Sequence, residues 1–179
     1  MDWGVAAESS IEVSAAAVDA NQLAEKARSI CLRKLARTPK SVHEIRSALI
    51  EQEIPLEIAE SVIERYLEVG LLDDEAFALA LANTRMRVKG LAKSAVRREL
   101  IKRGVAESVI DRVLGGITTE DELVEAIALT ERRFRQVAKL DRAVRYRRLS
   151  GFLARKGYSS SVISAAIRQA EASAVNLQS

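Results

Sequence analysis

The most constraining feature of the sequence is an apolar frame around a turn that occurs three times, about 50 residues apart. The middle copy consists of Val96, Leu100, Gly104, Val109, Ile110, Val113 and Leu114. The copy before it consists of Ile45, Leu49, Glu53, Ile58, Ala59, Val62 and Ile63. The copy after it consists of Leu149, Leu153, Gly157, Val162, Ile163, Ala166 and Ile167. A helix–turn–helix unit repeated in this way predicts an array of small helical modules instead of one core around a single pocket.

Composition narrows the fold class to helical proteins. The chain has 179 residues, of which only 2 are proline and 8 are glycine, so few positions interrupt helices. Aromatic residues make up 4% of the chain, and no segment alternates apolar and polar residues over the length of a strand. No apolar run is long enough to cross a membrane, and the first residues lack the pattern of a secretory signal. We therefore expect an all-α, cytoplasmic protein in which the single cysteine, Cys31, is a small core residue.

Helix start and stop signals divide the chain into segments. Residues 1–20 show no sustained helical periodicity, and we expect a disordered tail there. A helix is expected to start near Leu23, and Ser41 with Glu44 forms a capping box that opens the next helix. Pro55 suits the start of a third helix, which Gly70 can end. Three repeats are expected at residues 21–70, 71–116 and 117–172, followed by a C-terminal tail at 173–179.

Three acidic residues, beginning with Asp73, follow Gly70 at the junction between the first two repeats. Asp73 is placed to cap the next helix, with Leu72 and Phe77 at the two positions of a hydrophobic staple. Paired carboxylates also occur in acid–base catalysis and in divalent-metal sites. Because the sequence adds no partner histidine, second acidic cluster or glycine-rich phosphate loop, we favour capping and expect no enzyme, metal or cofactor.

Charge is distributed unevenly along the chain. Residues 1–84 carry 8 Lys or Arg against 15 Asp or Glu, whereas residues 85–156 carry 19 against 9. Between residues 132 and 156 there are 10 basic residues and one acid, Asp141. Such an excess is typical of a surface that meets a polyanion, although solvated helix faces and favourable charge at helix C-termini give the same pattern. We favour the polyanion interpretation and expect binding to weaken with added salt.

Several local motifs occur together between about residues 24 and 170. They comprise Gly70-Leu71-Leu72-Asp73-Asp74-Glu75-Ala76-Phe77-Ala78, Lys89-Gly90, Glu99-Leu100 with Gly104-Val105, and Phe152-Leu153-Ala154-Arg155-Lys156-Gly157-Tyr158-Ser159. This combination resembles the RecX family of bacterial recombination regulators. Two further segments are most similar to actinobacterial members, Cys31-Leu32-Arg33 and Val113-Leu114-Gly115-Gly116-Ile117. Glu53 departs from the pattern, since the other two repeats have glycine at this turn.

The resemblance implies a fold and a function. The implied fold is three tandem three-helix repeats in an elongated array, straight or curved according to the angles between repeats. The implied function is regulatory: RecX-type proteins lodge in the groove of the RecA–DNA filament, inhibit ATP hydrolysis and strand exchange, and favour filament disassembly. Such a regulator acts in DNA repair, recombination and the SOS response. We expect a monomer, because the sequence has no heptad seam for a coiled-coil dimer.

Basic residues of the second and third repeats are the candidate contacts to RecA and to single- or double-stranded DNA. They are Arg85, Arg87, Lys89, Lys93, Arg98, Lys102, Arg132, Arg133, Arg135, Lys139, Arg142, Arg145, Arg147, Arg148 and Arg155. We expect charge reversal at Arg145, Arg147 and Arg148 to weaken filament binding without unfolding the protein. The alternative function is a helix-turn-helix transcriptional regulator, but the basic residues are spread over two repeats and mark no single recognition helix.

Four aromatic residues accompany this basic region, namely Phe134, Tyr146, Phe152 and Tyr158. Stacking on nucleic-acid bases is one role for such rings. Their helical spacing favours core packing instead, because aromatic side chains dominate small cores.

Overall fold

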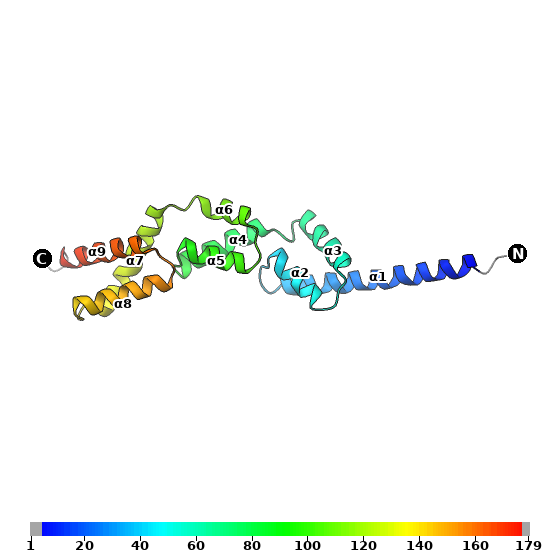
Figure 1. Ribbon diagram of the computed structural model, residues 1–179, viewed down its shortest axis with the longest axis horizontal. Coiled ribbons are helices and arrows are strands. Elements are labelled where there is room, and N and C mark those ends of the chain that lie inside the picture. The colour runs from blue at the N-terminus through cyan, green and yellow to red at the C-terminus, as the bar shows by residue number, and fades with distance from the viewer. Residues whose placement is uncertain (1–4, 177–179) are drawn as a thin grey trace. The chain divides into compact units, whose positions relative to one another are not determined.

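The computed structural model describes the backbone of residues 5–176 and the side chains of residues 19–174. Residues 5–176 contain nine α-helices, one π-helical turn and no strand, so the expected all-α fold is confirmed (Figure 1). The chain divides into two compact units, Met1–Phe77 and Ala78–Ser179. The first unit holds repeat 1, and the second holds most of repeat 2 and all of repeat 3.

Repeat 1 consists of α1 (Val5–Leu35), α2 (Val42–Ile50) and α3 (Leu56–Glu68). Its buried core contains Ala27, Ile30, Cys31, Ile45, Leu49, Ile54, Ala59, Val62, Ile63, Tyr66 and Leu72. Cys31 is fully buried, and this burial raises the pKa of its thiol above the ordinary value. A buried, protonated thiol packs as a small apolar group, so the predicted core role of Cys31 is confirmed.

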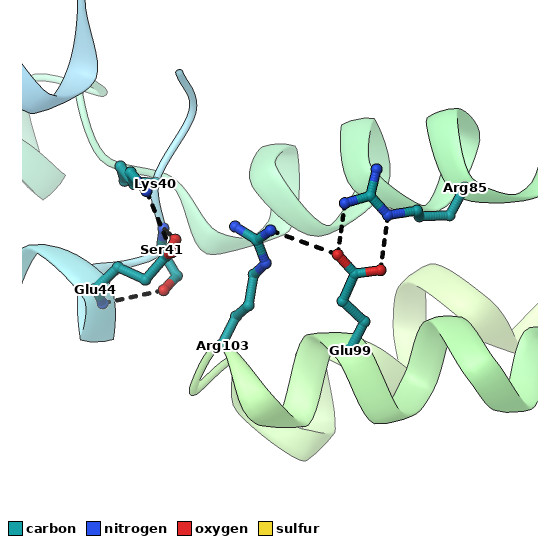
Figure 2. A network of polar contacts seen from close by, with 6 residues as sticks. All are labelled: Lys40, Ser41, Glu44, Arg85, Glu99 and Arg103. Carbon is teal, nitrogen blue, oxygen red and sulfur yellow. Dashed lines mark hydrogen bonds and ion pairs between the residues drawn. The ribbon is translucent and has the colours of Figure 1, made fainter. Parts of the chain in front are cut away.

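The start of α2 follows the predicted capping box. Ser41 Oγ accepts a hydrogen bond from the Glu44 backbone N–H at 3.1 Å, and Glu44 Oε2 accepts one from the Ser41 backbone N–H at 3.1 Å. Lys40 Nζ adds an ion pair to Glu44 at 3.3 Å, as Figure 2 shows. These contacts satisfy amide groups that the first turn of a helix leaves without an intrahelical partner.

Both ends of the chain differ from the sequence-based prediction. A disordered tail was expected over residues 1–20, but α1 begins at Val5. No glycine or proline interrupts residues 5–35, and the segment is rich in alanine, so backbone propensity allows one continuous helix. At the other end, the last helix continues to Asn176, beyond the expected boundary at residue 173. Trp3 and residues 177–179 lie outside the described residues.

The turn of the apolar frame has the same backbone conformation in all three repeats. Glu53, Gly104 and Gly157 have φ values of 58°, 73° and 94°, all in the left-handed region. The following backbone N–H donates to the carbonyl five residues earlier in each copy, over 3.1, 3.2 and 3.3 Å respectively. Repeat 1 therefore keeps the glycine-type turn, although a β-carbon is strained in this conformation.

Replacement of Glu53 by glycine is expected to raise the free energy of unfolding by about 1 kcal/mol. The change removes the strain of a left-handed residue, and the greater freedom of glycine in the unfolded chain offsets part of that gain. Urea denaturation measures the difference. The control is Glu51→Gly, which alters a right-handed residue with φ of −59° and is expected to destabilise. Equal effects of the two substitutions would contradict the prediction.

Repeat 2 consists of α4 (Asp74–Asn83), the π-helical turn η1 (Thr84–Val88), α5 (Lys93–Lys102) and α6 (Glu107–Gly115). Asp73 Oδ1 accepts hydrogen bonds from the backbone N–H groups of Glu75 at 2.8 Å and Ala76 at 2.9 Å. The predicted capping role of Asp73 is therefore confirmed. The frame residues Val96, Leu100, Ile110 and Leu114 are all fully buried.

Repeat 3 consists of α7 (Thr119–Val137), α8 (Arg142–Arg155) and α9 (Ser160–Asn176), and α7 packs against both other helices (Figure 1). The turn after α8 joins this repeat to repeat 2. Lys156 O accepts from the Ala92 backbone N–H at 2.9 Å, and Gly157 O accepts from Ser94 Oγ at 2.6 Å. Tyr158 Oη donates to Gly90 O at 3.4 Å. Repeats 2 and 3 therefore share an interface within the second unit.

Candidate functional site

The predicted basic residues lie on four helical elements of the second unit and just after two of them. The turn η1 carries Arg85 and Arg87 and is followed by Lys89, and α5 carries Lys93, Arg98 and Lys102. Helix α7 carries Arg132, Arg133 and Arg135 and is followed by Lys139. Helix α8 carries Arg142, Arg145, Arg147, Arg148 and Arg155. Most of these side chains are exposed, but three are partly buried, namely Arg85, Lys93 and Arg145. The partly buried residues have roles within the fold, and the exposed residues form the candidate surface.

Arg85 is held by Glu99, and this pair joins η1 to α5. The Arg85 guanidinium donates two hydrogen bonds to the Glu99 carboxylate, at 2.7 and 2.6 Å. Figure 2 shows Glu99 between Arg85 and Arg103, which approaches it at 3.4 Å. The hydrogen bond from Arg85 is the main cause that lowers the pKa of the Glu99 carboxyl below 4.5. Two planar groups paired in this way are strongly oriented, so Arg85 is engaged within the protein.

The Glu99 pair predicts a pH dependence of stability. Because the pKa of Glu99 is lower in the folded protein, its contribution is present above pH 4.5 and is lost as the pH falls through the folded-state value. Glu99→Gln is expected to lower the free energy of unfolding by about 1–2 kcal/mol at neutral pH and to have a smaller effect in acid. Urea denaturation at several pH values measures this. The exposed control Glu64→Gln is expected to follow the wild-type profile, and a Glu99→Gln effect independent of pH would contradict the prediction.

Arg145 connects the end of α7 to α9. Its guanidinium donates to the carbonyls of Ala138 at 3.3 Å and Leu140 at 3.2 Å, and pairs with Glu171 at 3.2 Å. It also lies 5.1 Å from the centre of the Phe134 ring, and only 17% of its side chain is exposed. Charge reversal here would place an acid against two carbonyls and a carboxylate. Reversal of Arg145 is therefore expected to disturb the fold, and Arg147 and Arg148 are the better positions to test.

Lys93 is a second basic residue with contacts inside the fold. Its ammonium group donates to Ile117 O at 2.9 Å, and its backbone N–H donates to Glu122 Oε1 at 2.9 Å. Arg142 differs, because it approaches Glu171 at 3.6 Å but stays 82% exposed. Such an exposed pair contributes little to stability.

Four of the predicted arginines gather around one groove between α7 and α8. This α7–α8 groove has a volume of about 520 Å³ and is lined by Arg133, Gln136, Val137, Arg147, Arg148, Gly151, Phe152 and Arg155. Among the residues that the structure describes, no carboxylate lines it. Arg133 and Lys156 lie 5.5 and 5.2 Å from the centre of the Phe152 ring, within the range of cation–π contacts. The groove thus combines positive charge with an aromatic side chain.

Sequence reasoning missed four members of this region, namely Gln136, Val137, Gly151 and Lys156. Lys156 follows Phe152 by four residues on one helix, a spacing that brings side chains together and that was visible in the sequence. Gln136 and Gly151 line the groove only because α7 and α8 pack against each other. No local pattern marks a residue whose position depends on a second helix.

The aromatic residues divide into three environments. Tyr158 is buried, and burial raises the pKa of its phenol to about 12. Phe134 and Phe152 are partly buried against the core of repeat 3. Tyr146 is 44% exposed, so its predicted core packing is wrong. Its hydroxyl lies 3.4 Å from Ser164 Oγ on α9.

Neither a metal cluster nor a membrane-spanning helix occurs in the part of the chain that the structure describes. No group of three His, Cys, Asp or Glu side chains is placed to hold a metal ion there. No helix within those residues is both long and apolar enough to span a bilayer.

Comparison with known proteins identifies the family. Models of the first, second and third three-helix domains of RecX match residues 27–65, 73–114 and 120–167. The regulatory protein RecX of Streptomyces coelicolor is 45% identical over 146 residues, which cover 82% of this chain and 78% of the relative. The regulatory protein RecX of Thermobifida fusca is 39% identical over 144 residues, covering 80% and 78%.

Solved structures agree with this result. A crystal structure of regulatory protein RecX aligns with a TM-score of 0.73 and 27% identity over 88% of this chain and 77% of that one. RecX from Lactobacillus salivarius aligns with a TM-score of 0.75 over 84% of this chain and 98% of that one, and its 16% identity supports the fold alone. Both relatives from sequence comparison are named as regulators and not as enzymes. The chain belongs to the RecX family of regulatory proteins, built from three tandem three-helix repeats.

Proposed function

We propose that this protein binds the RecA–DNA filament in the cytoplasm and inhibits ATP hydrolysis and strand exchange by RecA. It would act as a monomer without a cofactor and modulate recombination, DNA repair and the SOS response. The contacts would come from the exposed basic residues of repeats 2 and 3. A filament of RecA on DNA offers both phosphates and protein carboxylates, and guanidinium groups bind either anion in a bidentate manner.

The α7–α8 groove is the observation in this chain that carries the proposal. Its arginines are exposed, and no described carboxylate lines the groove to neutralise them. Where the fold needs an arginine for itself, as at Arg85 or Arg145, it supplies a carboxylate partner. The four arginines of the groove have no described carboxylate in its lining, which supports an external anion as their ligand. Membership of a family of regulatory proteins supports RecA as the target.

The test is RecA-dependent ATP hydrolysis on single-stranded DNA with this protein titrated in. Wild type is expected to inhibit, and Arg147→Glu/Arg148→Glu is expected to raise the half-inhibitory concentration by about tenfold or more. Each contact to a charged group contributes about 1.5–3 kcal/mol, and 1.4 kcal/mol is a factor of ten in affinity. The matched control is Arg33→Glu/Arg37→Glu, which makes the same charge change on exposed residues of the first unit.

Three results would count against the proposal. Absence of inhibition by wild type would contradict RecA as the target. Equal loss by the two double variants would show that net charge, and not the basic surface of repeats 2 and 3, controls inhibition. Sequence-selective protection of naked duplex in a footprinting assay would favour a transcriptional regulator.

A further inference from the structure

We infer that the α7–α8 groove is a binding site for single-stranded nucleic acid, with backbone phosphates held by Arg133, Arg147, Arg148 and Arg155. This inference deepens the proposed function, because it assigns direct contact with the nucleic acid to one groove of repeat 3. It rests on that function only for its biological setting. The groove itself is defined by the side chains that line it.

Comparison of repeats 2 and 3 shows why the charge of this groove is available. The shift of 53 residues that superimposes the two apolar frames aligns Glu99 with Phe152 and Arg103 with Lys156. In repeat 2 the Glu99 carboxylate lies between Arg85 and Arg103, within 2.6 and 3.4 Å of their guanidinium nitrogens. In repeat 3 the residue aligned with Glu99 is Phe152, which carries no charge. Repeat 3 therefore has an aromatic residue where repeat 2 has an internal anion, and an external anion can neutralise the arginines of the groove instead.

Gly151 is the second observation that points to a ligand. It lies within α8 on the lining of the groove, where glycine lowers helix stability relative to alanine. A β-carbon added at this position would meet only the Nη1 atom of Arg155, at 3.4 Å, which is the mobile end of a flexible side chain. Packing within the repeat therefore does not require glycine here. A glycine in the lining of a basic groove allows close approach of a ligand backbone.

The shape of the site favours a single strand over a duplex. The groove lies between two packed helices, whose axes are about 8–10 Å apart in such pairs, so it admits one chain. Proteins that bind single strands combine a positive groove along the backbone with aromatic side chains near the bases. The α7–α8 groove has both elements in its four arginines and in Phe152. An acidic peptide could meet the arginines, but it would gain less from the ring.

The experiment measures direct binding of the full-length protein in the absence of RecA. Fluorescence anisotropy is recorded with labelled oligothymidylate of about 20 nucleotides, somewhat longer than typical binding sites, and with a duplex of the same length. Wild type is expected to bind the single strand at least about tenfold more tightly than the duplex at low salt. Arg133→Gln/Arg155→Gln is expected to weaken this binding by about tenfold or more, since each contact to a charged group is worth about a factor of ten.

Salt dependence and a control separate this site from general electrostatic attraction. Loss of two phosphate contacts is expected to reduce the slope of log K against log salt by about 1.4. The control Arg33→Gln/Arg37→Gln removes the same charge from the end of α1 and the turn after it, and is expected to keep both affinity and slope. Equal affinity for single strand and duplex, or equal loss in the control, would overturn the inference. Displacement of the oligonucleotide by an acidic peptide at lower concentration than by unlabelled single strand would also overturn it.

Gly151→Ala is expected to change stability and binding affinity in opposite directions. The substitution is expected to raise the urea midpoint of unfolding, because alanine favours the helix, and to weaken binding of the single strand severalfold, because its methyl group enters the groove. A purely structural glycine would give lower stability, and that result would overturn the ligand role of Gly151.

Failure of the inference is distinguishable from failure of the proposed function: unchanged ATPase inhibition by Arg133→Gln/Arg155→Gln leaves the function standing. Oligonucleotide binding without ATPase inhibition by wild type leaves the groove assignment standing.

Discussion

Replacement of Leu72 by aspartate is expected to lower the free energy of unfolding by about 4 kcal/mol. Leu72 is only 2% exposed and belongs to the buried core of repeat 1, although it follows the last helix of that repeat. An ionised carboxylate at this position would lose its hydration without a cationic partner, and the apolar contacts of leucine would be lost as well. Thermal or urea denaturation measures the change.

The neighbouring residue provides the matched control. Leu71 is 52% exposed, so Leu71→Asp makes the same chemical change one position away and is expected to alter stability by less than about 0.5 kcal/mol. A Leu72→Asp melting curve that superimposes on that of Leu71→Asp would contradict the assignment of Leu72 to the core.

Replacement of Gly157 by alanine is expected to destabilise the protein by about 3 kcal/mol. Its φ of 94° is unfavourable for any residue with a β-carbon, at a cost of about 1–2 kcal/mol. The added methyl group would also lie 2.8 Å from Ala95 Cβ and 3.2 Å from the Ala95 backbone nitrogen. Relief of these contacts requires a shift of backbone, which overpacking typically makes unfavourable by about another 1–3 kcal/mol.

Gly70→Ala separates the two contributions to this effect. Gly70 has a φ of 70°, but a β-carbon there would meet nothing within 4 Å. Its substitution is therefore expected to show the backbone strain alone, about 1–2 kcal/mol. Urea denaturation of both variants gives the comparison. Equal destabilisation at the two glycines would mean that the close approach of Gly157 to α5 has no energetic consequence.

The repeated core of this fold was predictable because it depends on short-range periodicity. The frame around Gly104 and Gly157 predicts which residues face inward. Its apolar residues in repeats 2 and 3 are buried except Val109 and Val113, which are partly buried. The caps at Ser41 and Asp73 were predictable for the same reason, since each depends on residues within three positions. Such signals predict the local geometry because all of their residues are close together in the sequence.

The candidate site was less predictable, because a surface side chain is defined by its partners on other helices. Arg85 and Glu99 are 14 residues apart, and only the return of the chain through α5 brings them together. A signal did exist for such pairs: Arg46 binds Glu60 at 2.9 Å, and the corresponding Arg97 and Asp111 pair in repeat 2. The extent of α1 was missed for another reason, because a weakly amphipathic, alanine-rich segment gives little periodicity even when it is helical.

The hydrogen bond from the Ala92 N–H to Lys156 O has a consequence for how the chain opens. Ala92 is almost fully buried and packs with the core of repeat 3, although it belongs to repeat 2. Its amide proton can exchange with solvent only when the two repeats separate, so its exchange reports a joint opening and not the fraying of α5. Three copies in the sequence therefore do not make three independent cooperative units. A fragment ending at Gly116 would expose the Ala92 surface that the full chain covers.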